Sequence, residues 1–406
     1  MAVRTLDDLD PEGLAVGVRI DVNGPLDGRG RPVGTPRFEA HRATLEELLE
    51  GGARVALLAH QGRPGGDDFE PLAAHADRLC DLLGVEVGYV DAVCSHAARQ
   101  AVRDLDDGEI ACLENVRFYS EEPMQLAPER AAETHLVERL ARVLDVYVND
   151  AFAVAHRSQP SVVGFPRRLP SVAGRLLVRE VEALGDLAAT PTPRAAVLGG
   201  AKVDDSLDVL ERFLGDDLAD EVYVGGLVGN AFLVAAGADP GPATLADLDD
   251  RGLEPAVDAA RRALERFGER IRVPVDVAVD RGDERREVAV EDFPLGGDGV
   301  PRDVGAATVE RWRPRLADAG TVVVNGPLGL VEDPRFEAGT RAVFDAAAAA
   351  DRSIAGGGDT ATTIRRLGID GFDHVSTGGG AAIALLSGAR LPAIEALDAC
   401  AIELPT

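Results

Sequence analysis

Short runs of apolar residues alternate with helical patterns along the whole chain. The runs predict strands at 16–21, 54–59, 109–113, 145–148, 195–198, 221–224, 321–324, 353–355 and 374–376. Between them, apolar residues recur three and four positions apart, which predicts helices over segments that include 43–49, 71–83, 129–143 and 206–214. This alternation is typical of an α/β protein with parallel sheets, and the nearly continuous apolar strands indicate burial on both faces.

The chain changes character near residue 170. Before it, polar and basic residues follow the predicted strands, whereas glycine clusters follow them afterwards. The segment Ser171–Ala189 carries one apolar stripe that includes Leu177, Val181 and Leu184, which predicts a helix. We therefore expect two doubly wound, Rossmann-like parallel-sheet domains, 1–170 and 190–387, joined by a helix at 171–189.

Composition narrows the class of partner. The 406 residues include 42 basic and 70 acidic ones, a formal net charge of −28, which disfavours nucleic acid or an anionic membrane surface as a partner. The longest uncharged run, 222–238, has 17 residues and is too short to span a membrane. With four scattered cysteines and no apolar leader, we expect a cytoplasmic protein with reduced thiols. This acidic composition resembles that of cytoplasmic proteins from organisms that keep molar salt inside the cell.

Four segments of the second half share one design, a strand followed by glycines and then a helix. They are VLGGAKVDDSLDVL (197–210), VYVGGLVGNAFLV (222–234), SIAGGGDTATTIRRL (353–367) and HVSTGGGAAIALL (374–386). Glycines allow a ligand close to the backbone, and the free N–H groups at a helix start attract phosphate. The candidate nucleotide-binding residues of these turns are Gly199, Gly200, Gly225, Gly356, Gly357, Gly358 and Thr360.

Charged and polar residues accompany these glycines. Lys202 is the only lysine in the chain, and its compact ammonium suits a phosphoryl group in transit. Asp359 is either the N-cap of the helix that follows it or a ligand of Mg²⁺, and the two roles are compatible. In TVVVNGPLGLVE (321–332), Asn325 follows a buried strand, and Glu332 is a surface acid or an acceptor for a ribose hydroxyl.

The first half places arginines after its strands, which is unexpected in so acidic a protein. Asp21 and Asn23 follow the first strand, and Arg37 lies in a loop before a helix. The other candidates for binding a small anion follow later strands and are His60, Arg63, Arg117 and Arg157. An anion site of this kind beside a nucleotide site predicts phosphoryl transfer, which relies on positioning and charge neutralisation, across a cleft between two lobes.

Two other functions remain open at this point. The segment Gly356–Ala361 fits the loose G-x-G-x-x-A pattern, so a nicotinamide-dependent oxidoreductase is one alternative. A non-catalytic nucleotide-binding protein of the same fold is the other.

The motifs resemble the phosphoglycerate kinase family in order over nearly the whole chain. They are VRIDVNGP, LLAHQGRP, CLENVRFY, DVYVNDAFAVAHR, VLGGAKV, VVVNGPLGLVE, SIAGGGDTAT, HVSTGGGAAIALLSG and LPAIEAL. The resemblance implies that 3-phosphoglycerate binds the N-terminal domain and Mg-ATP or Mg-ADP the C-terminal one. It further implies that residues 388–406 return to the N-terminal domain, and we expect a monomer.

The resemblance also implies roles for individual residues. The glycerate would be held by Asp21, Asn23, Arg37, His60, Arg63, Arg117 and Arg157. Arg37, Lys202 and the backbone near Gly357 and Gly379 would act on the transferring group, while Asp359 would hold Mg²⁺ and Glu332 the ribose. The chain departs from the family at Ser206, where a second lysine is common, and at Gln159, where a second histidine is common.

Overall fold

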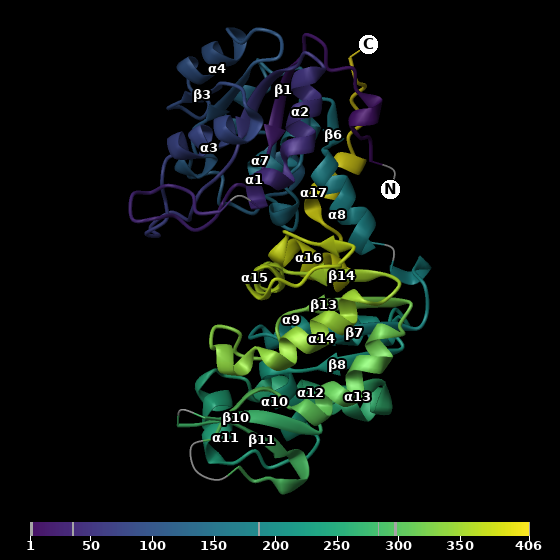
Figure 1. Ribbon diagram of the computed structural model, residues 1–406. Helices are drawn as coiled ribbons and strands as arrows, with labels where there is room; N and C mark the ends of the chain where they lie inside the picture. The colour runs from purple at the N-terminus through teal and green to yellow at the C-terminus, as the bar shows by residue number, and fades with distance from the viewer. Residues whose placement is uncertain (1–2, 35, 186, 283, 296–298, 406) are drawn as a thin grey trace. The chain divides into compact units, whose positions relative to one another are not determined.

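The chain forms two compact units. The computed structural model describes residues 3–34, 36–185, 187–282, 284–295 and 299–405 (Figure 1). The first unit contains the chain up to Glu182 together with the segment from Ala389 onward, and the second unit contains Ala183–Gly388.

The first unit is built on a six-stranded parallel sheet with the order β3-β4-β2-β1-β5-β6. Its strands are β1 (Ala15–Arg19), β2 (Arg54–Leu58), β3 (Val87–Val90), β4 (Ile110–Leu113), β5 (Val146–Asn149) and β6 (Ser171–Ala173). Its α-helices are α1 (Pro36–Ala40), α2 (Arg42–Glu50), α3 (Ala73–Leu83), α4 (His96–Arg103), α5 (Pro128–Ala131), α6 (His135–Leu140), α7 (Pro160–Val163), α8 (Arg175–Gly185) and α17 (Pro392–Asp398). Its described residues also form the 3₁₀ turns η1 (Leu6–Asp8), η2 (Val116–Phe118), η3 (Phe152–Val154) and η4 (Phe165–Arg167).

Alternate residues of the central strands pack into two hydrophobic cores, one on each face of this sheet. Val55 and Leu57 of β2 pack into the core that α2 and α3 cover, whereas Ala56 and Leu58 pack into the core that α4 and α6 cover. Burial on both faces explains why these strands are apolar without alternation.

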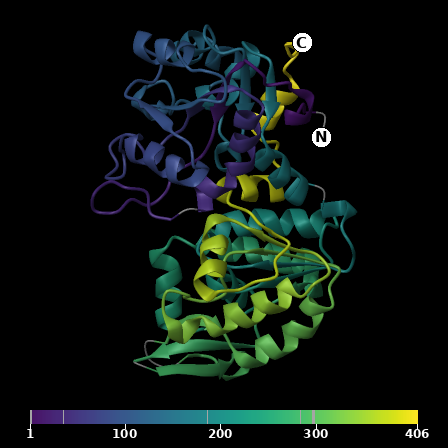
Figure 2. The same ribbon diagram turned by 45° about the horizontal axis from the view of Figure 1, so that its top comes forward.

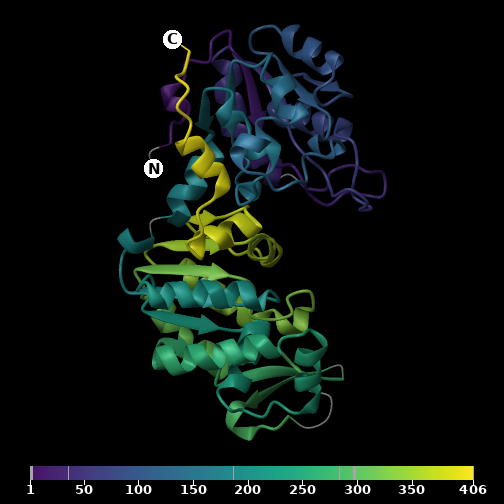
Figure 3. The same ribbon diagram turned by 180° about the vertical axis from the view of Figure 1, so that it is seen from behind.

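The C-terminal segment of the chain packs within the first unit. Helix α17 contacts α7 and β6, and the Ala393 amide donates to the Ala155 carbonyl at 3.1 Å. The guanidinium of Arg4 donates to the Cys400 carbonyl at 3.1 Å. Figure 3 shows this yellow segment running beside the purple start of the chain.

The second unit repeats the design with the strand order β15-β14-β13-β7-β8-β9, again parallel. The strands are β7 (Arg194–Leu198), β8 (Glu221–Val224), β9 (Ile271–Arg272), β13 (Thr321–Asn325), β14 (Ser353–Gly356) and β15 (His374–Val375). Helices cover both faces of this sheet (Figure 2). They are α9 (Val203–Gly215), α10 (Gly226–Ala235), α12 (Glu254–Phe267), α13 (Ala306–Ala317), α14 (Ala338–Ala348), α15 (Gly358–Leu367) and α16 (Gly379–Leu386), while α11 (Pro242–Asp250) lies beside strands β10 and β11 (Figure 1). Its 3₁₀ turns are η5 (Leu187–Ala189), η6 (Gly268–Arg270), η7 (Val290–Asp292) and η8 (Pro334–Phe336).

A small antiparallel sheet in the second unit was not predicted from the sequence. It has the order β11-β10-β12, with β10 (Asp276–Arg281), β11 (Glu284–Ala289) and β12 (Pro301–Val304). Strand β11 contains no fully buried residue, so it lacks the apolar run by which the other strands were recognised.

The expected α/β class with two parallel sheets is confirmed, but two predicted helices are wrong in detail. Ser171–Ala173 form strand β6, paired with β5, so the helix expected over Ser171–Ala189 begins only at Arg175. The helix expected over 129–143 is broken into α5 and α6, with Thr134 as the N-cap residue of the second.

Candidate active site

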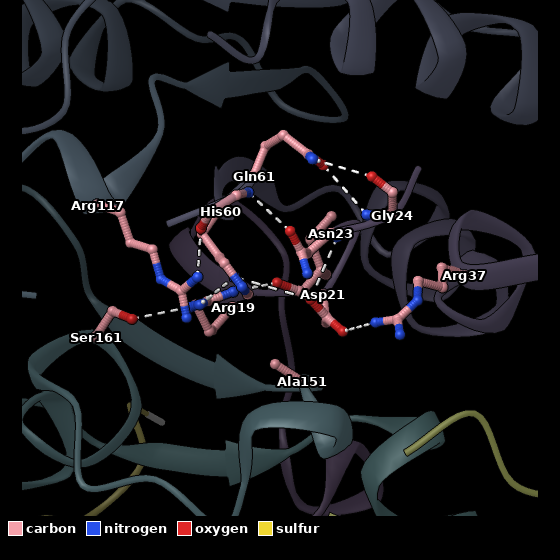
Figure 4. A network of polar contacts seen from close by, with 12 residues as sticks. Arg19, Asp21, Asn23, Gly24, Arg37, His60, Gln61, Arg117, Ala151 and Ser161 are labelled. Carbon is pink, nitrogen blue, oxygen red and sulfur yellow. Dashed lines mark hydrogen bonds and ion pairs between the residues drawn. The ribbon is translucent and has the colours of Figure 1, made fainter. Parts of the chain in front are cut away.

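In the first unit, the predicted anion-binding residues lie at the carboxyl ends of neighbouring strands. Asp21 and Asn23 follow β1, His60 follows β2, and Arg117 lies in η2 after β4. Parallel strands all end at the same edge of the sheet, so these side chains meet there. Figure 4 shows Asp21, Asn23, His60 and Arg117 in one network with Arg37. Arg37 lies within α1, so the loop position expected for it is wrong.

The Asp21 carboxylate is the centre of this network. Its side chain is buried, and it forms an ion pair with Arg37, whose side chain stays 37% exposed. The other Asp21 oxygen accepts the Asn23 amide at 3.3 Å and lies 3.8 Å from His60 Nδ1. Asp21 therefore holds the Arg37 guanidinium in place while leaving part of it accessible to a ligand.

Side-chain amides join the loops that follow β1 and β2. Asn23 Oδ1 accepts the Gly62 amide at 2.8 Å, and Gln61 exchanges two hydrogen bonds with the Gly24 backbone at 3.0 and 3.1 Å. A residue other than glycine is strained at position 62, where φ is +68° and a Cβ would lie 2.3 Å from the Asp68 carbonyl oxygen. These hydrogen bonds fix the loop after β1 and the loop after β2 to each other.

Positively charged side chains surround these two loops. Burial, and then Arg19 and Arg117, hold the pKa of His60 well below its ordinary value, so its imidazole is neutral. Burial, and then Arg19 and Arg157, lower the pKa of Arg117 to about 10. Burial, followed by the charge of Arg63, lowers the pKa of Arg157. The positive side chains of this cluster repel one another, and a bound anion would relieve that repulsion.

A second buried imidazole supports Asp21 from behind. The Asp21 amide donates to His41 Nε2 at 3.0 Å, and His41 Nδ1 lies 2.6 Å from Asp150. The other Asp150 oxygen accepts the Leu176 amide at 2.9 Å in the first turn of α8. The anion site is thereby linked to the helix that leads out of the first unit.

A third buried histidine gives a pH prediction. His75 of α3 is fully buried, contacts Gln61 Oε1 at 3.1 Å through Nε2, and has a pKa that burial lowers from 6.5 to about 4. Below pH 6.5 the unfolded chain binds a proton at His75 that the folded chain does not take up. The free energy of unfolding should therefore decrease as the pH is lowered from 6.5 to about 4. At pH 5 we expect it to be about 2 kcal/mol smaller than at neutral pH.

The check is the melting temperature at pH 7 and pH 5 in wild type and in His75→Gln. Glutamine does not titrate and keeps a donor for Gln61, so the variant should lose less stability on acidification. Equal losses in the two proteins would contradict the assignment.

In the second unit, glycines let three turns pack backbone against backbone. The Gly200 amide donates to Pro327 O at 2.7 Å, and the Gly226 amide donates to Leu328 O at 2.9 Å. A Cβ at position 199 would lie 2.3 Å from Pro327 O, so only glycine fits there. Strands β7 and β13 are adjacent but continue into opposite halves of the sheet, and ligands of open α/β sheets bind at this switch point.

The predicted phosphate-binding residues line one small cavity at this point. Its lining is Gly199, Gly200, Ala201, Lys202, Ser206, Asn325, Gly326, Gly357, Gly358, Asp359, Thr360, Gly379 and Ile383. Lys202 Nζ lies 3.9 Å from Asp359, and both side chains are mostly exposed. Asp359 is not the N-cap of α15, because Gly357 takes that position with φ of +93°. The hydroxyl oxygen of Thr360, in the first turn of α15, accepts a hydrogen bond from the Gly326 amide at 2.8 Å.

A larger cavity of about 370 Å³ lies beside the small one. It shares Gly200, Ala201 and Asp359 with it and extends to Glu332 and Arg366. Its volume is that of a site for a nucleoside-sized ligand. Gly225 and Gly356 line neither cavity: a Cβ at these positions would meet Leu328 and Leu386, so both glycines serve packing.

Four supporting residues of the first unit were missed from the sequence: Arg19, His41, Glu122 and Asp150. All are at least 99% buried and contact the site from behind. Arg19 carried a usable signal, because strand alternation places it on the same face as Asp21 two residues later. Asp150 also carried a signal, because it directly follows strand β5, whereas His41 and Glu122 lie in turns with no distinctive pattern.

Phosphoryl transfer is the class of reaction that both units fit, since one provides an anion site of arginines and the other a turn of amides with an ammonium and a carboxylate. The family model for phosphoglycerate kinase matches residues 6–389. A phosphoglycerate kinase of Halobacterium salinarum is 54% identical over 397 residues, covering 98% of this chain and all of the relative. The enzyme of the same name from Methanopyrus kandleri is 44% identical over 98% of both chains. A crystal structure of phosphoglycerate kinase from Pyrococcus horikoshii has a TM-score of 0.91 and 40% identity, covering 97% of this chain and 98% of the other.

The chain therefore belongs to the phosphoglycerate kinase family. This confirms the family resemblance, and the comparisons give no support to an oxidoreductase or a non-catalytic binding protein. Among the helices that the structure describes, none has the length and apolar character to cross a membrane.

Proposed function

We propose that this chain transfers a phosphoryl group reversibly between 1,3-bisphosphoglycerate and ADP on one side and 3-phosphoglycerate and ATP on the other. Family membership over nearly the whole chain is the observation that carries the proposal. The acceptor in the ATP-consuming direction is a carboxylate, which is ionised at neutral pH and needs no general base. The neutral state of His60 agrees with a site that binds anions without removing a proton.

The first unit is the proposed site of 3-phosphoglycerate. Arg63, Arg117, Arg157 and His60 would bind the substrate's phosphate or carboxylate, with Asp21 and Asn23 for its polar groups. Arg37 is the proposed group that neutralises charge on the phosphoryl group during transfer, because its guanidinium is both fixed by Asp21 and partly exposed.

The second unit is the proposed site of the nucleotide. Glu332, in the larger cavity, would accept from the ribose, while the amides near Gly357 and Gly379 and the Asn325 side chain would face the phosphates. Lys202 would follow the transferring group. Ser206, where relatives often carry a lysine, is buried and donates weakly to Gly199 O at 3.4 Å, so Lys202 is the only ammonium available there.

Mg²⁺ fits this site as a partner of the nucleotide. Asp359 offers an exposed carboxylate in the small cavity, and the described residues contain no group of three or more His, Cys, Asp or Glu side chains that could hold a metal by themselves. Mg²⁺ commonly binds through one carboxylate together with substrate phosphates, where it neutralises their charge. We therefore assign Asp359 to the metal.

The test is ATP-dependent phosphorylation of 3-phosphoglycerate in molar KCl, measured through a coupled assay and compared with NAD-dependent oxidation under the same conditions. We expect turnover that requires both 3-phosphoglycerate and Mg-ATP. Hydride transfer to NAD without consumption of ATP would reject the proposal.

Salt should control the stability of the enzyme. The net charge of −28 creates repulsion within the folded chain, and the Debye length falls from about 10 Å at 0.1 M salt to about 3 Å at 1 M. We expect the melting temperature and the activity to rise together between 0.1 and 2 M KCl. A melting temperature that does not depend on KCl would contradict this expectation.

A further inference from the structure

The support of the anion site begins with Arg19, which is completely buried at the end of β1. Its guanidinium donates in three directions: Nε to Ser161 Oγ at 2.8 Å, Nη1 to the Ile20 carbonyl, and Nη2 to His60 Nδ1 at 3.1 Å (Figure 4). Because Arg19 is buried and its three nitrogens already donate to protein atoms, we infer that it orients neighbouring side chains and does not bind the substrate itself.

These contacts decide where His60 carries its proton. An arginine can only donate hydrogen bonds, so the Nδ1 atom of His60 must accept from Arg19. The ring is neutral, because burial and the surrounding arginines depress its pKa. A neutral imidazole whose Nδ1 accepts has its hydrogen on Nε2. His60 can therefore donate from Nε2 to an anionic substrate.

The orientation of Arg19 is in turn set by a buried carboxylate. Glu122 accepts the Ser161 amide at 2.9 Å and the Ser161 hydroxyl at 2.6 Å. The hydroxyl hydrogen is committed to Glu122, so the oxygen lone pairs remain to accept from Arg19 Nε. Tyr147, through its hydroxyl, also fixes the Ser161 carbonyl at 2.7 Å. Glu122 is itself fully buried, and burial raises the pKa of its carboxyl, whereas the charge of Arg19 and the two hydrogen bonds from Ser161 lower it and favour the ionised form.

We propose that Ser161 and Glu122 are positioning residues of the anion site, which act through Arg19 to hold His60 as the Nε2–H tautomer that donates to the substrate. The inference deepens the proposed function and rests on it for the identity of the substrate. The order of action is Glu122, Ser161, Arg19, His60. Neither Ser161 nor Glu122 needs to touch the substrate.

The variant that tests it is Ser161→Ala, with Ser171→Ala as the matched control. Ser171 is another buried serine of the first unit, whose hydroxyl donates to the Leu169 carbonyl at 2.9 Å away from the network. We expect Ser161→Ala to raise the KM for 3-phosphoglycerate about tenfold, equivalent to about 1.4 kcal/mol. Its kcat and its KM for ATP should change little, and the control should leave all three unchanged.

A second measurement reads the tautomer directly. In protein labelled with ¹⁵N at its seven histidines, the His60 ring signals are assigned by their loss in His60→Gln. Wild type should show His60 as the Nε2–H form from pH 6 to 8, and Ser161→Ala and Glu122→Gln should shift it toward a mixture. A protonated or Nδ1–H ring in wild type would overturn the proposal, as would unchanged signals and KM in Ser161→Ala.

The two measurements separate this inference from the proposed function. The tautomer is observed without substrate, so it is tested even if 3-phosphoglycerate proves not to be the acceptor. Wild type could lack turnover and still show the predicted His60 tautomer, with that tautomer lost in the variants. The proposed function would then be wrong, whereas the positioning role of Ser161 and Glu122 would be confirmed.

Discussion

Replacing Lys202 by alanine should lower kcat by about 10²–10³, the cost typical of removing one charge donor from a transition state. The described residues that line the small cavity include only this one side-chain cation, so no other side chain of that lining can take over its charge. The KM for the nucleotide should change less than kcat, because the glycine amides and the larger cavity remain.

Two further variants sharpen that result. Lys202→Arg should recover only part of the lost rate, because a planar guanidinium does not reproduce a compact ammonium. Arg261→Ala removes an exposed cation of α12 that pairs with Asp258 and lines neither cavity, and it should keep full activity. Full activity in both Lys202 variants would show that the assigned role is wrong.

Replacing Arg37 by alanine should reduce kcat by about 10² or more in the same assay. The Asp21 carboxylate is buried, and Arg37 is the partner that neutralises it at close range. The variant would remove the charge offered to the phosphoryl group and would also leave Asp21 as an unpaired anion inside an anion site. Both effects oppose the bound transition state.

Arg42→Ala is the matched control for Arg37. It lies five residues later in α2 and forms exposed pairs with Glu39 and Glu46. We expect its steady-state constants to equal those of wild type within twofold, as is usual for exposed ion pairs. If Arg37→Ala retained more than half of the wild-type kcat, Arg37 would have no part in transfer.

Most strands of the parallel sheets were predictable because they are short, apolar and separated by helices, but the edge strands β3 and β9 were missed. Each of the four glycine segments forms the expected strand, turn and helix. The sheet of β10, β11 and β12 was not predictable in this way, because β11 reads ERREVA and lies largely exposed. Strand β6 was missed because Ser171–Ala173 is short and adjoins a true helix, so the apolar period of α8 was extended backward over it.

The side chains that a ligand could reach were easier to predict than those that support them. Asp21 and Lys202 stand in motifs directly after strands, where chain direction alone places them at the sheet edge. Arg19 and Ser161 are 142 positions apart and meet only in the folded core. Local sequence carries no information about such a pair, since the hydrogen bond depends on β1 and α7 being brought together.

The single lysine also gives the chain an uncommon chemical handle. Reagents that acylate amines but spare guanidinium groups would find one side-chain target, Lys202, whose side chain is 61% exposed. A fluorophore attached to that nitrogen would sit beside Asp359 without any engineered cysteine. The rate of its attachment, slowed by whatever occupies the cavity, would report occupancy directly.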